Sequence, residues 1–190
     1  MSIWLLHLPL TAEEEAHLTG RTHLPLPIED VPDLSLMMRP VECRHLLQAL
    51  HPEEPPEAIS RRLERIWRLY TGVHAEDIIA VPLPARGELA LAEVTGKYQY
   101  QVGEGGEDHH RVPVTWHRPI LLRRFRKFKE LLVPGGEKMH EIASAPARIA
   151  IRDTLPHRYN RFARWKWLLA LFFLLGMLRA LHRLAMTLYQ

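Results

Sequence analysis

Three aromatic residues around a glycine-rich loop carry the clearest binding chemistry in this chain. The segment AEVTGKYQYQVGEGGEDHHRVPVTW, residues 92–116, places Tyr98, Tyr100 and Trp116 on two runs of alternating residues. Side chains on one side of paired strands are neighbours, so the three rings are expected near one another. Aromatic faces hold a flat base or a methylated group, and polar neighbours read its edge. The pattern indicates a stacking pocket, with core packing of the same rings as the alternative.

The chain offers little for catalysis or for metal binding. Twelve histidines are present, but Cys43 and His45 have no second pair that would complete a tetrahedral metal site. The adjacent His109 and His110 follow two acidic residues, a pattern that favours a solvated loop over a weak metal site. A phosphate-binding loop, a dinucleotide fingerprint and a nucleophile elbow are all missing from the sequence. We therefore predict a non-enzymatic protein without a cofactor or a metal.

Charge divides the chain into an acidic part and a basic part. Residues 1–118 hold 11 Lys and Arg against 18 Asp and Glu, a net charge of −7, whereas residues 119–190 hold 14 against 4, a net charge of +10. Such asymmetry suggests a contact with nucleic acid or a membrane surface in the C-terminal part. The single cysteine excludes an intrachain disulfide and points to a reducing compartment.

The positioning elements begin with a strand and three helices. Residues 3–8 are expected as a first strand and not as a signal peptide, because no basic region or cleavage site accompanies the apolar start. Short helices are expected at TAEEEAHL, which Thr11 opens, and at residues 41–50. The clearest helix covers residues 57–70, where one face at helical spacing holds Ile59, Leu63, Ile66, Trp67 and Tyr70.

A period of two follows and predicts closely spaced strands. Alternating residues run through DIIAVPLP, ELALAEV, the Tyr98–Val102 run and the Val112–Trp116 run. Gly96 suggests a bulge or a close backbone approach, and a last strand is expected at residues 147–152. Short strands with flanking helices predict an α+β fold, namely a small mixed β-barrel with helices packed outside.

A basic amphipathic helix is expected at residues 120–132, with Leu121, Phe125, Phe128 and Leu132 on its apolar face. The other positions are cationic and are expected, together with residues 148–166, to hold nucleic-acid phosphates or anionic lipid. These basic residues are Arg123, Arg124, Arg126, Lys127 and Lys129.

The composition changes after a basic linker, residues 153–164. Residues 167–178, WLLALFFLLGML, carry no charge, yet twelve helical residues span only about 18 Å of a hydrocarbon core of about 30 Å. A helix that continues to about Leu188 is long enough to span, at a cost of roughly 2.5–3.5 kcal/mol for Arg179 near its middle. The alternative is a helix buried against a partner or in an oligomer.

Flanking residues favour the membrane anchor for residues 165–190. Basic side chains precede the apolar run and tryptophans stand beside it, as in an interfacial belt with a basic cytoplasmic side. The residues expected at the membrane are Trp165, Trp167, Phe172, Phe173 and Leu175. Residues 1–160 would then lie on the cytoplasmic face of the inner membrane.

The order of six short blocks resembles the EVE-type, PUA-like domain at the N-terminus of Mrr- and McrBC-type restriction proteins. The blocks are DLS at 33–35, ALHP at 49–52, RIWRLY at 65–70, EDIIAVP at 76–82, LALAEVTGKYQY at 89–100 and HHRVPVTW at 109–116. The resemblance covers roughly residues 1–152. This chain departs from it at His7, where the family often has arginine, in PLPIEDVP, which replaces a glycine-tryptophan before DLS, and at Glu76, where the family has glycine.

The resemblance implies a small mixed barrel that binds modified bases, in relatives by flipping the base into an aromatic cage. The pocket residues it implies are Trp4, Ser35, Tyr98, Tyr100 and Trp116. Our leading hypothesis is therefore a membrane-tethered reader of modified DNA, or less favourably RNA, in phage defence, with an effector nuclease or ATPase on another chain. The alternative is a membrane scaffold whose barrel binds a partner protein, and a third hypothesis is a subunit of an enzyme encoded beside it.

Overall fold

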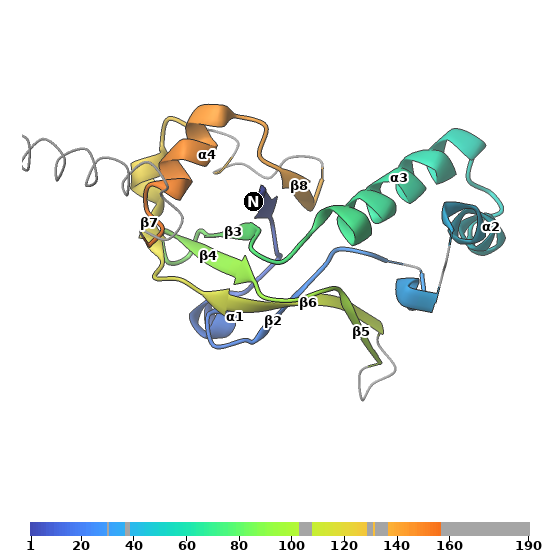
Figure 1. Ribbon diagram of the computed structural model, residues 1–190, viewed down its shortest axis with the longest axis horizontal. Coiled ribbons are helices and arrows are strands. Elements are labelled where there is room, and N and C mark those ends of the chain that lie inside the picture. The colour runs from blue at the N-terminus through green and yellow to red at the C-terminus, as the bar shows by residue number, and fades with distance from the viewer. Residues whose placement is uncertain (30, 37–38, 103–107, 129–130, 132–136, 157–190) are drawn as a thin grey trace, which may run out of the picture. The chain divides into compact units, whose positions relative to one another are not determined.

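A curled sheet that forms half a barrel is the centre of the fold (Figure 1). The computed structural model describes residues 1–29, 31–36, 39–102, 108–128, 131 and 137–156. The chain falls into two compact units, residues 1–145 and residues 146–190, and the sheet belongs to the first. Helices and strands are both present and the sheet is mixed, so the predicted α+β class is confirmed.

The sheet has the strand order β2-β6-β4-β3-β1-β8, with β5 paired to β6 and β7 paired to β4. Only the pairing of β1 with β3 is parallel among the described strands. The strands are β1 (Ile3–Leu6), β2 (His23–Pro25), β3 (Ile78–Leu83), β4 (Glu88–Val94), β5 (Gln99–Val102), β6 (Asp108–Trp116), β7 (Ile120–Leu121) and β8 (Met139–Glu141).

Both faces of the central strands are buried. Trp4, Ile79 and Ala92 belong to one large core, whereas their strand neighbours Ile3, Ile78 and Leu91 are equally buried on the other face. This double burial explains why the central strands IWLL, IIAVPL and ELALAEV are almost continuously apolar. The large core also takes in apolar residues of α1, α2 and α3.

The helices are α1 (Ala12–Leu18), η1 (Leu34–Leu36), α2 (Pro40–Leu50), α3 (Pro56–Gly72), η2 (Leu122–Phe125) and α4 (Ala145–Arg152). Thr11 opens α1 with a capping box: its hydroxyl accepts the Glu14 N–H, and its own N–H donates to the Glu14 carboxylate. The carboxylate of Glu15 is buried and accepts backbone N–H groups of Ala85 and Arg86. These bonds attach α1 to the turn between β3 and β4.

A buried carboxylate joins the start of the chain to β3. Asp77 accepts hydrogen bonds from the Ser2 N–H at 2.5 Å, the His74 N–H at 3.0 Å and the Trp4 indole N–H at 3.4 Å. Its side chain is almost fully enclosed, so each of these donors satisfies a charge that water does not reach. The parallel pairing of β1 with β3 is held at this point.

The close approach expected at Gly96 is confirmed, and Glu76 has an unusual backbone conformation. A Cβ at Gly96 would lie 2.9 Å from the Pro113 ring, so glycine is required by the close approach of the two chains. Glu76 has a left-handed φ of 72°. Its N–H donates to Val94 O at 2.8 Å, which places it at the entry to β3.

The segment predicted as a final strand, residues 147–152, is helical in α4, so that prediction is wrong. Alanine is the strongest helix former, Pro146 is tolerated in a first helical turn, and Ala147 and Ile151 have helical i, i+4 spacing. The apolar residues of ARIAIR are spaced to suit either a strand or a helix, and the helix propensity of the segment favours the helix.

The predicted helix at 120–132 is also wrong over the described residues. Ile120 and Leu121 pair with β4, and η2 follows them. The Phe128 N–H donates to Phe125 O and the Leu131 N–H to Phe128 O, so the apolar side chains repeat every three residues instead of following an α-helical face. Pairing with β4 satisfies the backbone at 120–121, where a helix would leave the edge of β4 open.

Membrane anchoring is a prediction for residues 165–190, which lie outside the described residues together with the linker from residue 157 onward. Within the described ranges, no helix combines the length and the apolar character needed to cross a bilayer. The proposed membrane residues Trp165, Trp167, Phe172, Phe173 and Leu175 therefore have no structural description.

The left-handed backbone at Glu76 generates a prediction. Replacing Glu76 by glycine should raise the free energy of unfolding by about 0.5–1 kcal/mol. Glycine removes the strain of about 1–2 kcal/mol that a left-handed conformation imposes on an L-residue, but it also loses more conformational entropy on folding, which offsets part of this stabilisation. Urea unfolding of the full chain measures it. A β-branched Glu76→Val variant should lose stability, and a glycine variant less stable than the parent would contradict the assignment.

Candidate functional site

A row of rings runs from α3 onto the edge of the sheet. Trp67 lies 5.6 Å from Tyr70, and Tyr70 meets Tyr98 edge-to-face at 5.0 Å, all between ring centroids. The row continues to His110 at 5.8 Å from Tyr98, and Tyr100 lies 5.2 Å from that imidazole. The four Trp and Tyr side chains are half-buried, whereas His110 is enclosed. We call these five residues the aromatic row.

Hydrogen bonds fix the middle of the aromatic row. Nε2 of His110 is 2.9 Å from Val31 O, which only accepts, so Nε2 carries the proton and Nδ1 is an acceptor. The Tyr98 hydroxyl lies 2.8 Å from that Nδ1 and therefore donates to it. The same hydroxyl accepts the Leu34 N–H at 3.2 Å. One neutral tautomer thus ties residues 31–34 to β5 and β6.

Burial is the largest cause that raises the pKa of the Tyr98 hydroxyl far above its usual range. The Leu34 N–H lowers the pKa, and the carboxylate of Asp33 adds to the rise. The hydroxyl therefore stays protonated and keeps its donor role toward His110 at neutral pH.

Three of the five pocket residues implied by the family resemblance lie in or beside the aromatic row. Tyr98 and Tyr100 belong to it, with Tyr100 opposite His110 in the strand register. Ser35 is exposed on η1, directly after Leu34, and its N–H donates to the Asp33 carboxylate at 2.9 Å. The 33–35 segment is therefore a polar neighbour of the rings.

The other two implied pocket residues lie elsewhere. Trp4 is 2% exposed in the core, and its ring lies so close to Gly72 that a Cβ there would be 3.2 Å from it. Trp116 stands six residues beyond His110 on β6, about 20 Å along an extended strand. Its indole N–H donates to Arg21 O at 2.6 Å. Neither indole is part of the aromatic row.

Sequence reasoning missed three members of the row. Trp67 and Tyr70 were expected on the buried face of their helix, but Leu69 is fully buried there and both rings are only partly buried. His110 was expected in a solvated loop, and this is wrong, because it lies on β6 and is 2% exposed. Continuing the alternation of Val112 and Val114 backward by one step would have placed it on the buried side.

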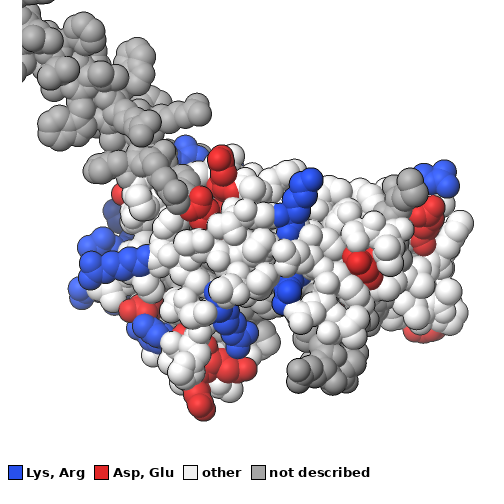
Figure 2. All heavy atoms as spheres, turned by 60° about the horizontal axis from the view of Figure 1, so that its bottom comes forward, with Lys and Arg blue, Asp and Glu red and all other residues white. Residues whose placement is uncertain are grey.

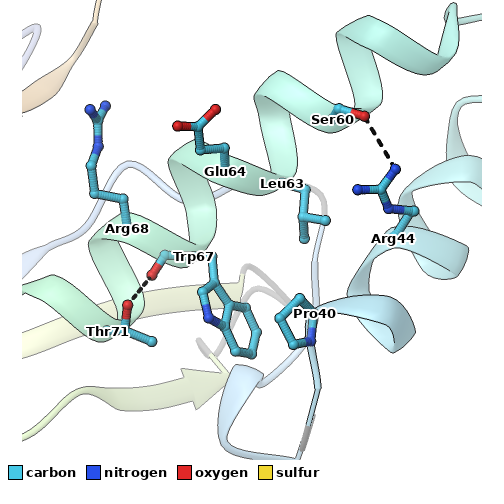
Figure 3. A pocket seen from close by; sticks show the side chains of 8 residues that line it. All are labelled: Pro40, Arg44, Ser60, Leu63, Glu64, Trp67, Arg68 and Thr71. Atoms are coloured by element: carbon cyan, nitrogen blue, oxygen red, sulfur yellow. Dashed lines mark hydrogen bonds between the residues drawn. The ribbon is translucent and has the colours of Figure 1, made fainter.

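A groove between α2 and α3 adjoins the row at Trp67 (Figure 3). Its volume is about 490 Å³, and the indole and the Pro40 ring stand beside each other in it. Polar groups surround them: Arg44 donates to the Ser60 hydroxyl at 3.2 Å, and Thr71 donates to Trp67 O at 2.8 Å. The lining residues are Pro40, Arg44, Ser60, Leu63, Glu64, Trp67, Arg68 and Thr71.

The predicted phosphate-binding residues lie at a different end of the sheet. Arg123 and Arg124 are on η2 and, with Arg126 and Lys127, are exposed around the buried Phe125. Lys129 lies outside the described residues. Figure 2 shows basic side chains gathered at the end of the molecule that holds β7. The strand β7 pairs with the start of β4, whereas the rings lie beyond the end of β4.

The described ranges contain no group of three His, Cys, Asp or Glu side chains arranged to hold a metal ion. Cys43 is buried on α2, and burial raises the pKa of its thiol.

Comparisons of the chain with protein-family models, with curated proteins and with solved structures give no match. No finding identifies an EVE-type or PUA-like domain, and that resemblance stays a prediction.

The hydrogen-bond network generates a stability prediction. Tyr98→Phe removes one hydroxyl and leaves two buried groups, the Leu34 N–H and Nδ1 of His110, without their partner. The free energy of unfolding should fall by about 2–6 kcal/mol, since two groups lose their partner and each such loss costs about 1–3 kcal/mol. Urea unfolding of the full chain measures it. Tyr70→Phe is the matched control and should change stability by less than about 0.5 kcal/mol; equal losses in both variants would argue against the network.

Proposed function

We propose that residues 1–152 form a non-enzymatic module that binds a base of nucleic acid against the aromatic row. The observation that carries this is the row itself: four partly buried rings follow one another, and the two tyrosines at one end contact an imidazole that is hydrogen-bonded at both ring nitrogens. Rings that stay partly exposed yet rigid are suited to stack on a flat partner.

The geometry of two tyrosines supports a flat ligand. Tyr70 and Tyr98 meet at an interplanar angle of 86°, so they form a corner. A flat group that stacks on one ring meets the other edge-on, as aromatic pairs prefer. Hydrogen bonding to the ligand edge falls to the polar 33–35 segment beside the rings, since the Tyr98 hydroxyl is already committed to Leu34 and His110.

The resemblance to the EVE-type, PUA-like family supports modified DNA as the ligand, with RNA as the second choice. It also supports a setting in phage defence, with a nuclease or ATPase on another chain as effector. Residues 165–190 would tether the module to the cytoplasmic face of the inner membrane, and oligomerisation through the same segment is compatible with this. The half-barrel sheet is consistent with such a domain.

Binding of labelled oligonucleotides tests the proposal. Fluorescence polarisation with methylated and unmodified DNA duplexes should show a preference for a modification, and Tyr100→Ala should weaken that binding roughly 5- to 150-fold, because one base–aromatic stack is worth about 1–3 kcal/mol. Trp116→Ala is the matched control outside the row and should bind like the parent. The proposal fails if no modification is preferred and Tyr100→Ala binds with full affinity.

A second candidate function is a scaffold that binds a partner protein. Large apolar side chains are exposed on η1 and at both ends of α2, with Leu36 78%, Val41 55% and Leu50 50% exposed. Exposed apolar side chains of this size are a feature of protein-binding surfaces. In this function the aromatic row packs at the edge of the core and binds no ligand, and the basic residues contact lipid headgroups only.

Liposome flotation separates the tether from the ligand. The full chain should float with vesicles that contain anionic phosphatidylglycerol, and a chain ending at Pro156 should not, because the apolar run and its basic flank are removed. Flotation of the full chain without any DNA binding would favour the scaffold. Equal flotation of both chains would exclude residues 157–190 as the anchor.

A further inference from the structure

We propose that a hollow on α3 binds a phosphoryl group of the nucleic-acid backbone. The charge distribution along the sequence pointed instead to the basic C-terminal part of the chain. Three arginines of α3, Arg61, Arg62 and Arg65, border the hollow. The hollow measures about 350 Å³, within the range of ligand sites. The inference rests on the proposed function, since the base and the phosphate would belong to one ligand.

The lining of the hollow combines an apolar floor with a cationic rim. The lining residues are Pro27, Glu29, Glu54, Ala58, Arg61, Arg62, Arg65 and Ile66. Ile66 is buried, whereas Arg61 and Arg65 are exposed, one helical turn apart on α3. A planar guanidinium matches two phosphate oxygens at once, so two such groups at i and i+4 can hold one tetrahedral anion from two directions.

The acidic side chains at the hollow already have cationic partners of their own. Arg62 and Glu54 form an ion pair at 2.7 Å, and Glu29 pairs with Lys138. Arg61 and Arg65 have no acidic partner among the residues that the structure describes. Two like charges at i, i+4 repel each other by about 0.2–0.5 kcal/mol, and an anion between them reverses this cost. A net positive hollow stands here within the part of the chain, residues 1–118, that carries a charge of −7.

The hollow adjoins the aromatic row through two shared elements. Ile66 and Tyr70 lie one turn apart on α3, about 6 Å along its axis. The loop of residues 26–31 supplies Pro27 and Glu29 to the hollow and also bonds His110 at both of its ends: the Leu26 N–H donates to His110 O, and Val31 O accepts from the imidazole. A base on the row and a phosphate in the hollow are thus within reach of one nucleotide strand.

The salt dependence of DNA binding tests this assignment. Replacing Arg61 and Arg65 by glutamine in the full chain should reduce the slope of log Kd against log salt by about 0.7–0.9, the change expected when one phosphate contact is lost. The preference for the modified base should be unchanged. Arg86→Gln is the matched control, because Arg86 is an exposed arginine of the β3–β4 turn that pairs with Glu88; it should leave the slope within about 0.3 of the parent.

Separate outcomes distinguish this site from the base site. Tyr100→Ala should remove the base preference and keep the salt slope, and an unchanged slope in the double arginine variant overturns the phosphate site. If the modification and Tyr100→Ala have no effect while the arginine variant still lowers the slope, the proposed base reading fails and the phosphate site stands. A last experiment measures the binding of inorganic phosphate to the parent and to the double arginine variant. If the variant loses phosphate binding while its DNA binding is unchanged, the assignment to the nucleic-acid backbone is overturned.

Discussion

The hydrogen bonds around His110 are the constraint on which the candidate site depends. Among the described residues between Leu26 and Leu36 the short helix η1 is the only regular element, yet this segment must lie against β6 to make one side of the site. The neutral imidazole achieves this by donating to Val31 O and by accepting from Tyr98, whose hydroxyl in turn accepts the Leu34 N–H. With the imidazole neutral, each group in this chain of bonds has a partner, so the polar network is satisfied without a charge.

The double-sided sheet gives that network a rigid support. Its central strands are buried on both faces, and Asp77 anchors the first strand by collecting three N–H donors. The left-handed Glu76 precedes that carboxylate and turns the chain into β3. Strain at one residue is offset by buried hydrogen bonds at the next, which is how a sparsely populated backbone conformation persists in a folded chain.

Basic side chains gather at two separate places in this protein. Basic residues accumulate toward the C-terminus, and the exposed cations around Phe125 lie by β7, away from the rings. Arg61, Arg62 and Arg65 lie instead on α3, the helix that also carries Tyr70, inside the acidic part of the sequence. A ligand that uses the rings and these arginines needs both a flat group and an anion, which together describe a nucleotide.

Much of the architecture was determined by the sequence itself. The capping box at Thr11, the helix around Ile59 and Leu63 and the alternating strands from Ile78 to Trp116 follow from local rules of capping and periodicity, so they could be predicted. Only the tertiary structure decided which aromatics meet. Tyr98 and Tyr100 lie in the row because β5 pairs with His110, whereas Trp4 turns into the core and Trp116 follows β6 to its far end. The strand predicted at residues 147–152 was wrong because a short run of alternating apolar residues fits a helix as well as a strand. The helix predicted over residues 120–128 was wrong because the pairing of this segment with distant residues such as Leu89 cannot be inferred from the local pattern. The site brings together α3, η1, β5 and β6, and long-range pairing is the physical reason that no single stretch of sequence reveals it.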